Sequence, residues 1–153
     1  MKPLPHIILG FIFSLLLLII FPQIKLYGFL VIFLSSFLID VDHYIYYVCR
    51  KKDFSLKNAY NWFIKNGKKY KKLSKEKRKK VYLGICVFHG IESFIIISIL
   101  SFYSKFFLFI LTGFLFHRLT DSINSLYEDE EGHPLSIIDL YLKSSKLKDI
   151  EDI

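Results

Sequence analysis

Four apolar stretches of the chain carry histidines or acidic residues near one end, and both residue types bind metal ions. They are His6 in the first stretch, Asp40, Asp42 and His43 in the second, His89 and Glu92 in the third, and His117 and Asp121 in the fourth. One charged side chain at the centre of a membrane helix costs roughly 2.5–3.5 kcal/mol. Several such residues in four separate apolar stretches need a common reason, and a shared metal site supplies one.

The spacing of these residues places an imidazole and a carboxylate on the same face of a helix, because residues three or four apart are neighbours there. The pairs are Asp40 with His43, His89 with Glu92, and His117 with Asp121. Helix bundles build carboxylate–histidine metal sites from such pairs. This ligand chemistry suits zinc, which we expect, with manganese or iron as alternatives. Together with His6 and Asp42, the pairs exceed what one tetrahedral ion needs, so we expect about two or three ions per chain.

Three residues are candidates for the chemistry beside the metal. Glu92 or Asp42 could accept a proton from an attacking water, and Arg118 could stabilise a developing oxyanion or hold a phosphate. Asp42 points away from Asp40 on an ideal helix, so it joins the site only if the helix is distorted or the metals span two faces. It could equally orient a histidine from behind. Arg118 reaching the membrane surface is the alternative for that residue, and His133 is expected to be an exposed loop residue rather than a ligand.

Apolar runs of this length predict membrane-spanning helices. The chain is 53% hydrophobic and 18% aromatic, with a mean hydropathy of +0.39, and about 20 helical residues cross the roughly 30 Å hydrocarbon layer. We predict an all-α, integral membrane four-helix bundle in one domain, residues 1–153, with spans near 6–22, 26–48, 81–103 and 106–127. The first run ends without a small-residue cleavage site, which favours a retained helix over a signal peptide.

Charge predicts the orientation of these helices. The segment 49–80 is dense in lysine and arginine and contains only two acidic residues, Asp53 and Glu76. The positive-inside rule therefore predicts a basic cytoplasmic loop, both termini in the cytoplasm and a plasma or inner membrane location. All the candidate ligands then fall in the cytoplasmic half of the membrane. The tail 128–153 is expected to contain a short amphipathic helix with Leu135, Ile138 and Leu142 on one stripe.

The basic loop also predicts a partner. Aromatic residues mixed with lysines indicate contact with an anionic lipid leaflet, and nucleic acid is not expected, because a cytoplasmic membrane loop already explains the charge. An oligomer is left open. The two cysteines, Cys49 and Cys86, show neither CxxC spacing nor a disulfide pattern, and the predicted ligand set contains no thiolate.

The motifs resemble those of the YdjM-like membrane-bound metal-dependent hydrolases. The matching features are Asp-x-Asp-His from Asp40, a histidine motif opening the third stretch, and Gly-x3-His-x3-Asp from Gly113 to Asp121, over about residues 6–125. That family is similar to the zinc-dependent phospholipase C and P1 nuclease group, which are helical enzymes with clustered zinc ions. The resemblance implies a zinc-dependent hydrolase whose ligand pairs correspond to His117 with Asp121 and, loosely, His89 with Glu92. Bacterial members carry Thr-His-Ser where this chain has His89-Gly90-Ile91-Glu92-Ser93.

These observations predict a metal-dependent hydrolase that acts on a phosphoester or lipid-like substrate at the cytoplasmic membrane interface. A divalent-cation or proton transporter is the main alternative, and a structural membrane protein with a metal clasp is the second. A transporter needs polar lining on both sides of its site, and the outer halves of these stretches offer only serines and Thr112.

Overall fold

The computed structural model describes residues 3–78, 80–84, 86–127, 136, 138, 141–142 and 147–152, and the chain is mostly helical, as predicted for an all-α protein. Its contacts divide it into two compact units. The first consists of Met1–Asp40 and Phe88–His133, and the second of Val41–Val87 and Pro134–Ile153.

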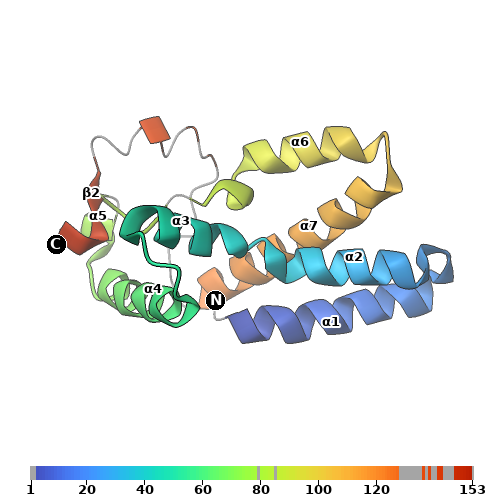
Figure 1. Ribbon diagram of the computed structural model, residues 1–153, viewed down its shortest axis with the longest axis horizontal. Coiled ribbons are helices and arrows are strands. Elements are labelled where there is room, and N and C mark those ends of the chain that lie inside the picture. Colours follow the sequence, from blue (N-terminus) through green and yellow to red (C-terminus); the bar gives the residue numbers. More distant parts are fainter. Residues whose placement is uncertain are drawn as a thin grey trace. The chain divides into compact units, whose positions relative to one another are not determined.

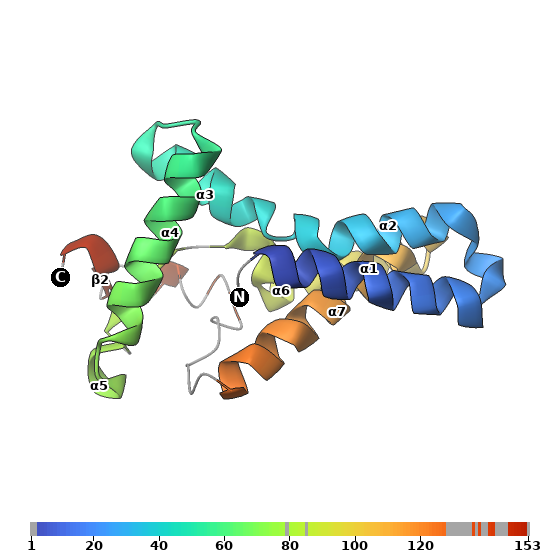
Figure 2. The ribbon, with the colours of Figure 1, turned by 90° about the horizontal axis from the view of Figure 1, so that it is seen from below.

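The first unit is built from four apolar helices. These are α1 (Pro3–Ile20), α2 (Lys25–Leu38), α6 (Ile91–Ser101) and α7 (Lys105–Tyr127), with the short 3-10 turn η1 (Pro22–Ile24) between α1 and α2. Pro22 has no amide proton with which to continue α1, and it opens the turn instead. The helix α2 packs against both α1 and α7, and α6 packs against α7 (Figures 1 and 2).

Small residues let α2 approach its two neighbours closely. A Cβ atom on Gly113 of α7 would lie 2.6 Å from the carbonyl oxygen of Ile32 and 2.9 Å from the amide nitrogen of Ser36, and it would overlap the Ser35 hydroxyl. A Cβ on Gly10 of α1 would overlap the Ser36 hydroxyl in the same way. Glycine and serine at helix contacts are typical of membrane bundles, where backbones pack together without bulky side chains. The close approach brings the α2 backbone within reach of side chains on α7.

Two helical stretches are long and apolar enough to cross a membrane, judged by length and composition. They are Pro22–Lys51, which includes η1 and α2, and Lys105–Tyr127, whereas α1 and α6 are shorter apolar helices. The structure differs most from the predicted span 81–103, which is continuous helix only over Ile91–Ser101. Eleven residues rise about 16 Å, roughly half the hydrocarbon thickness. The all-α class is therefore shown, while the four-span arrangement is not.

The second unit contains the whole of the basic segment 49–80, and the described part of that segment is largely helical. The elements of the second unit are α3 (Val41–Lys51), α4 (Leu56–Lys71), α5 (Lys75–Arg78), the strands β1 (Val81–Tyr82) and β2 (Lys148–Asp149), and the 3-10 turn η3 (Ile150–Asp152). Ser55 caps α4 by accepting a hydrogen bond from the Asn58 amide at 3.3 Å. Asp53 precedes the cap and accepts hydrogen bonds from the Tyr47 hydroxyl at 2.6 Å and the Ser55 amide at 2.9 Å. These contacts fix the turn that joins α3 to α4.

The segment Lys148–Asp152 is held to the rest of the second unit by a short parallel strand pair and by charged contacts. The two strands β1 and β2 pair in parallel, and Arg50 lies 2.6 Å from Asp149. Glu151 accepts hydrogen bonds from Lys51 and from the Trp62 indole, both at 2.7 Å. Burial alone would raise the pKa of Glu151, but these donors stabilise the carboxylate and hold its pKa below the usual value. Half of the residues of the predicted amphipathic helix at 135–142, Leu135 among them, lie outside the described residues.

Candidate metal centre

Five of the predicted ligands lie together in the first unit. They come from four places in the sequence: His6 on α1, Asp40 directly after α2, His89 at the end of the 3-10 turn η2 (Val87–His89), and His117 and Asp121 on α7. The three histidines and Asp121 are buried, and the Asp40 side chain is 26% exposed. Two overlapping groups have ligand atoms within 4.8 Å of one another, namely His6, Asp40 and His117, and His89, His117 and Asp121.

Imidazole nitrogens surround the two carboxylates of this centre. Asp121 Oδ1 lies 3.1 Å from His6 Nε2, and Asp121 Oδ2 lies 3.2 Å from His117 Nε2 and 3.9 Å from His89 Nε2. Asp40 Oδ1 lies 3.5 Å from the Nε2 atoms of both His89 and His117. The Nε2 atoms of His89 and His117 are themselves 3.3 Å apart. Every one of these contacts therefore involves an Nε2 atom.

Hydrogen bonds on the other side of the rings determine which nitrogen carries the proton. His117 Nδ1 lies 2.8 Å from the carbonyl oxygen of Ser36, which can only accept, so this nitrogen donates. The Thr120 hydroxyl donates to the His117 carbonyl oxygen at 2.8 Å, so its oxygen is left to accept from His6 Nδ1 at 3.2 Å. Both imidazoles thus carry their proton on Nδ1 and direct an Nε2 lone pair at Asp121. This is the outer hydrogen bonding that orients histidine ligands of metal ions.

Lone pairs of the imidazole nitrogens and of the carboxylate oxygens therefore face one another in the centre. When His6 and His117 are neutral in this tautomer, their Nε2 atoms and the oxygens of Asp121 are all acceptors, and contacts of 3.1–3.2 Å between acceptors are repulsive without a positive charge between them. A divalent ion with nitrogen and oxygen preference satisfies all of them together. Each Nε2 atom can bind one ion, whereas the Asp121 carboxylate offers two oxygens and can bridge two ions. The chemistry of the donor set therefore fits a metal centre.

The imidazole–carboxylate pairs predicted from the sequence have different surroundings in the structure. His117 and Asp121 contact each other across one helical turn, as predicted. The helix is interrupted after Leu38, where the Asp40 amide donates to Phe37 at 3.2 Å in a 3-10 pattern, and Asp40 contacts His89 and His117. The interruption also removes the constraint that residues two apart must point in opposite directions.

Four other predicted residues have different surroundings. Glu92 is half-buried in the first turn of α6, and among the described residues the groups of close ligand atoms do not include it. Arg118, next to His117 on α7, is half-buried. Asp42 and His43 belong to the second unit. The catalytic roles of Glu92, Asp42 and Arg118 therefore stay predictions, and His133 lies outside the described residues.

Two orienting groups were missed by reasoning from the sequence. Thr120 lies three residues after His117 and so shares a helix face with it, which is a signal that the sequence does contain. The Ser36 carbonyl carries no such signal, because any residue at that position would offer the same oxygen. Its role depends on the close approach of α2 and α7 at Gly113.

Comparison of the chain with protein-family models, with curated proteins and with solved structures finds no match. The resemblance to the YdjM-like hydrolases therefore rests on the sequence motifs alone, and the function has to be inferred from the geometry and chemistry of the centre.

Proposed function

We propose that the chain is a membrane-bound, metal-dependent hydrolase whose centre is formed by His6, Asp40, His89, His117 and Asp121. The observation that carries the proposal is the convergence of Nε2 lone pairs and carboxylate oxygens, with two of the imidazoles locked in the metal-binding tautomer by Ser36 and Thr120. A divalent ion, zinc by preference, would supply Lewis acidity and lower the pKa of a water molecule.

A membrane location is supported by the apolar surface of the first unit. Large apolar side chains are exposed on all of its helices, among them Ile19 on α1 at 66%, Ile96 on α6 at 58% and Leu119 on α7 at 56%. Soluble monomers rarely expose contiguous apolar surface of this extent, and lipid would cover it. Several polar residues of the same helices, among them His6, Ser36 and His117, are buried instead, as expected of a bundle in lipid.

The location of the centre indicates the class of substrate. Its residues lie at one end of the apolar helices: near the start of α1, at the end of α2, before α6 and in the second half of α7 (Figure 1). By the charge pattern this is the cytoplasmic end. A centre at that depth meets lipid headgroups, so we propose a phosphoester or another amphiphilic ester as substrate.

Other side chains are assigned roles in hydrolysis. Glu92, in the first turn of α6, is proposed to accept a proton from the attacking water. Arg118 follows His117 on α7, and its guanidinium is proposed to stabilise negative charge that develops on the substrate.

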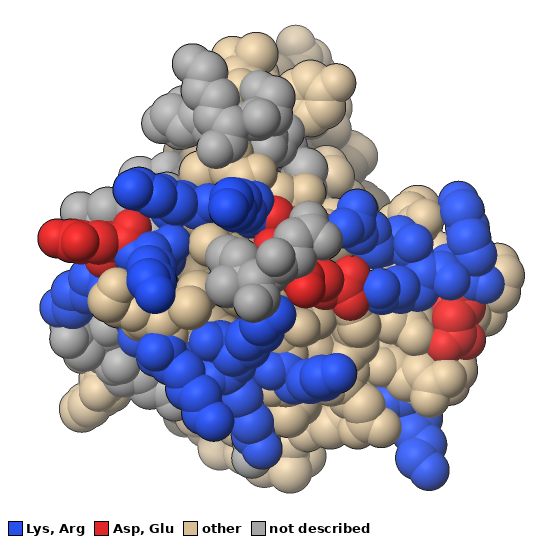
Figure 3. All heavy atoms as spheres, turned by 90° about the vertical axis from the view of Figure 1, so that its left-hand side faces the viewer, with Lys and Arg blue, Asp and Glu red and all other residues tan. Residues whose placement is uncertain are grey.

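We further propose that α4 lies on the anionic leaflet. Its exposed lysines Lys57, Lys65, Lys68 and Lys71 form one stripe, here named the lysine face. At 3.6 residues per turn they fall within about a third of the helix circumference. Figure 3 shows lysine and arginine side chains gathered on one face of the molecule. Each charge near an anionic membrane contributes about 1 kcal/mol of attraction, and the exposed Phe54 next to α4 offers an apolar anchor.

Metal analysis of the purified chain tests the proposed centre. The wild type is expected to retain a stoichiometric transition metal after dialysis, while His117→Ala and Asp121→Asn are expected to retain fewer ions per chain. Asp53→Asn is the matched control, because Asp53 lies in the second unit outside the centre. A folded wild-type chain that binds no transition metal would overturn the proposal and leave a purely structural His–Asp cluster.

Activity separates the enzyme from the transporter. The metal-loaded protein is expected to hydrolyse a phosphoester in mixed micelles, and Glu92→Gln is expected to abolish turnover without loss of the metal. Uptake of a radiolabelled divalent ion into liposomes, without turnover, would instead identify a transporter.

A further inference from the structure

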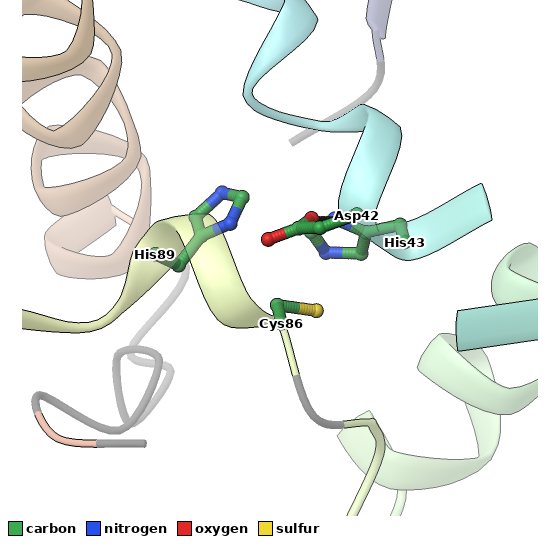
Figure 4. Close-up of side chains that lie close together, drawn as sticks. All are labelled: Asp42, His43, Cys86 and His89. Atoms are coloured by element: carbon green, nitrogen blue, oxygen red, sulfur yellow. Dashed lines mark hydrogen bonds and ion pairs between the residues drawn. The ribbon is translucent and has the colours of Figure 1, made fainter. Parts of the chain in front are cut away.

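Three metal-binding side chains meet in the second unit. Asp42 and His43 lie in the first turn of α3, and Cys86 lies between β1 and η2. Their potential ligand atoms, a carboxylate oxygen, an imidazole nitrogen and the cysteine sulfur, lie within 4.8 Å of one another. Figure 4 shows the side chains of Asp42 and His43, which extend from α3, beside the side chain of Cys86. None of the three belongs to the five-residue centre.

The imidazole of His43 is held in place by its neighbours. Its Nδ1 atom lies 2.8 Å from Asp42 Oδ1, and the ring packs edge-on against Phe63 of α4 at a centroid distance of 5.3 Å. The Nδ1 and Oδ1 atoms are close enough for one ion to bind both, because neighbouring ligand atoms of a tetrahedral zinc ion lie about 3 Å apart. Asp42 is 4% exposed, and a buried carboxylate is stabilised by a cation beside it.

We propose that Asp42, His43 and Cys86 form a second metal site, which takes a thiophilic divalent ion such as zinc. Thiolate ligation favours zinc over magnesium, calcium and manganese, which prefer oxygen. Binding converts the Cys86 thiol to a thiolate, and the displaced proton passes to solvent. Three protein ligands leave one coordination position of a tetrahedral ion for a water molecule or a further ligand.

The site connects two segments of the second unit. Asp42 and His43 start α3, whereas Cys86 follows β1, so a bound ion would cross-link the two ends of the segment that contains α3, α4 and α5. Its ligand set contains sulfur, and that of the five-residue centre does not. The second site is therefore inferred from its own geometry and does not depend on the hydrolase proposal.

Cobalt substitution of the full chain tests the second site directly. Cobalt(II) bound to a thiolate shows a sulfur-to-metal charge-transfer absorption in the near ultraviolet, which nitrogen and oxygen ligands do not produce. We expect this band in the cobalt-loaded wild type and its loss in Cys86→Ser. The matched control is Cys49→Ser, because Cys49 is the other free cysteine and is exposed on α3. Asp42→Asn is expected to weaken cobalt binding at the site by about 10–100-fold.

The five-residue centre provides a second control. His117→Ala, which removes a ligand of that centre, is expected to leave the charge-transfer band intact, so loss of one site is distinguished from loss of the other. Absence of the band in the wild type, or its persistence in Cys86→Ser, overturns the proposal.

Thiol alkylation of the wild-type chain tests the site without any substitution. Zinc is expected to slow the reaction of Cys86 with iodoacetamide at least about tenfold, as read by mass spectrometry of the labelled peptides, and to leave Cys49 unaffected. Equal labelling of Cys86 with and without zinc contradicts the proposal, even if Cys86→Ser fails to fold.

Discussion

Thr120 joins two of the proposed metal ligands, and its replacement by valine tests the chemistry of the centre. Its hydroxyl donates to the His117 carbonyl oxygen at 2.8 Å and accepts from His6 Nδ1 at 3.2 Å. Valine has nearly the same shape but neither bond, so Thr120→Val removes the orienting group and disturbs the packing little. The His6 ring remains stacked on the His117 ring at a centroid distance of 4.1 Å. The change therefore acts on the proton of His6 rather than on its position.

The magnitude follows from the two states then open to His6. If the proton stays on Nδ1, a buried donor is left without its acceptor, at a cost of about 1–3 kcal/mol. If the proton moves to Nε2, that nitrogen donates to Asp121 and can no longer bind an ion. Either state opposes metal binding, so we expect the affinity of the centre to fall by about 10–100-fold, the range typical of lost outer-shell partners. This corresponds to about 1.4–2.7 kcal/mol.

The assay is competition for zinc between the apoprotein and a chromophoric chelator in detergent. Thr112→Val is the matched control, because Thr112 lies on the same helix and its hydroxyl also donates to a backbone carbonyl, that of Leu108 at 2.8 Å. We expect wild-type zinc affinity for Thr112→Val. A folded Thr120→Val protein with wild-type affinity, or an equal loss in both variants, would refute the assignment of His6 as an oriented ligand.

Three further outcomes are expected from other parts of the chain. Gly113→Ala places a Cβ against the α2 backbone and should lower both the thermal unfolding temperature and the metal content. The control is Gly67→Ala, whose Cβ would have nothing within 4 Å and which should stabilise α4 by about 0.5–1 kcal/mol. Equal effects of the two substitutions would contradict the close packing of α2 and α7. The hydrogen bond from the Tyr47 hydroxyl lowers the pKa of Asp53 in the folded protein. The stability that this bond contributes is therefore present above the pKa of Asp53 in the unfolded chain, and it is lost as the pH falls through the folded-state pKa. The unfolding-temperature difference between wild type and Tyr47→Phe should then be largest at neutral pH and vanish in acid, and a difference independent of pH would exclude this role. Replacing the lysine face by glutamate should remove hydrogen-exchange protection of α4 in anionic nanodiscs, with neutral nanodiscs as the control; protection that is the same in both lipids would contradict the leaflet contact.

Local spacing predicted the part of the centre that lies on one helix. The contact between His117 and Asp121 follows from a separation of four residues, and no tertiary information is needed for it. The partners of Asp40 could not be predicted in the same way, because the helix ends after Leu38 without a proline or glycine to mark the interruption. Asp40 lies close to His89 because of the way α2, α6 and α7 pack together.

The segment 81–103 shows where hydrophobicity alone misleads. Its apolar run predicts one spanning helix, but Gly84 and Gly90 interrupt it, and Gly90 adopts extended backbone angles as the N-cap of α6. Glycine lowers helix stability by about 1 kcal/mol per residue, so these positions do carry a signal for the interruption. The segment 49–80 was predicted as a loop, although Ala59, Phe63 and Asn66 repeat at helical spacing and so carry a signal for α4.

The contact between Trp62 and Glu151 provides an intrinsic fluorescence probe of this part of the chain. Trp62 is the single tryptophan of the sequence, and its indole nitrogen donates to a carboxylate in the segment Lys148–Asp152. Tryptophan emission, excited at wavelengths that tyrosine does not absorb, therefore comes from one place, the junction between α4 and that segment. A fused tag, a truncation or a ligand that detaches the segment would change the emission without any introduced label, while unfolding confined to the first unit would leave it unaltered.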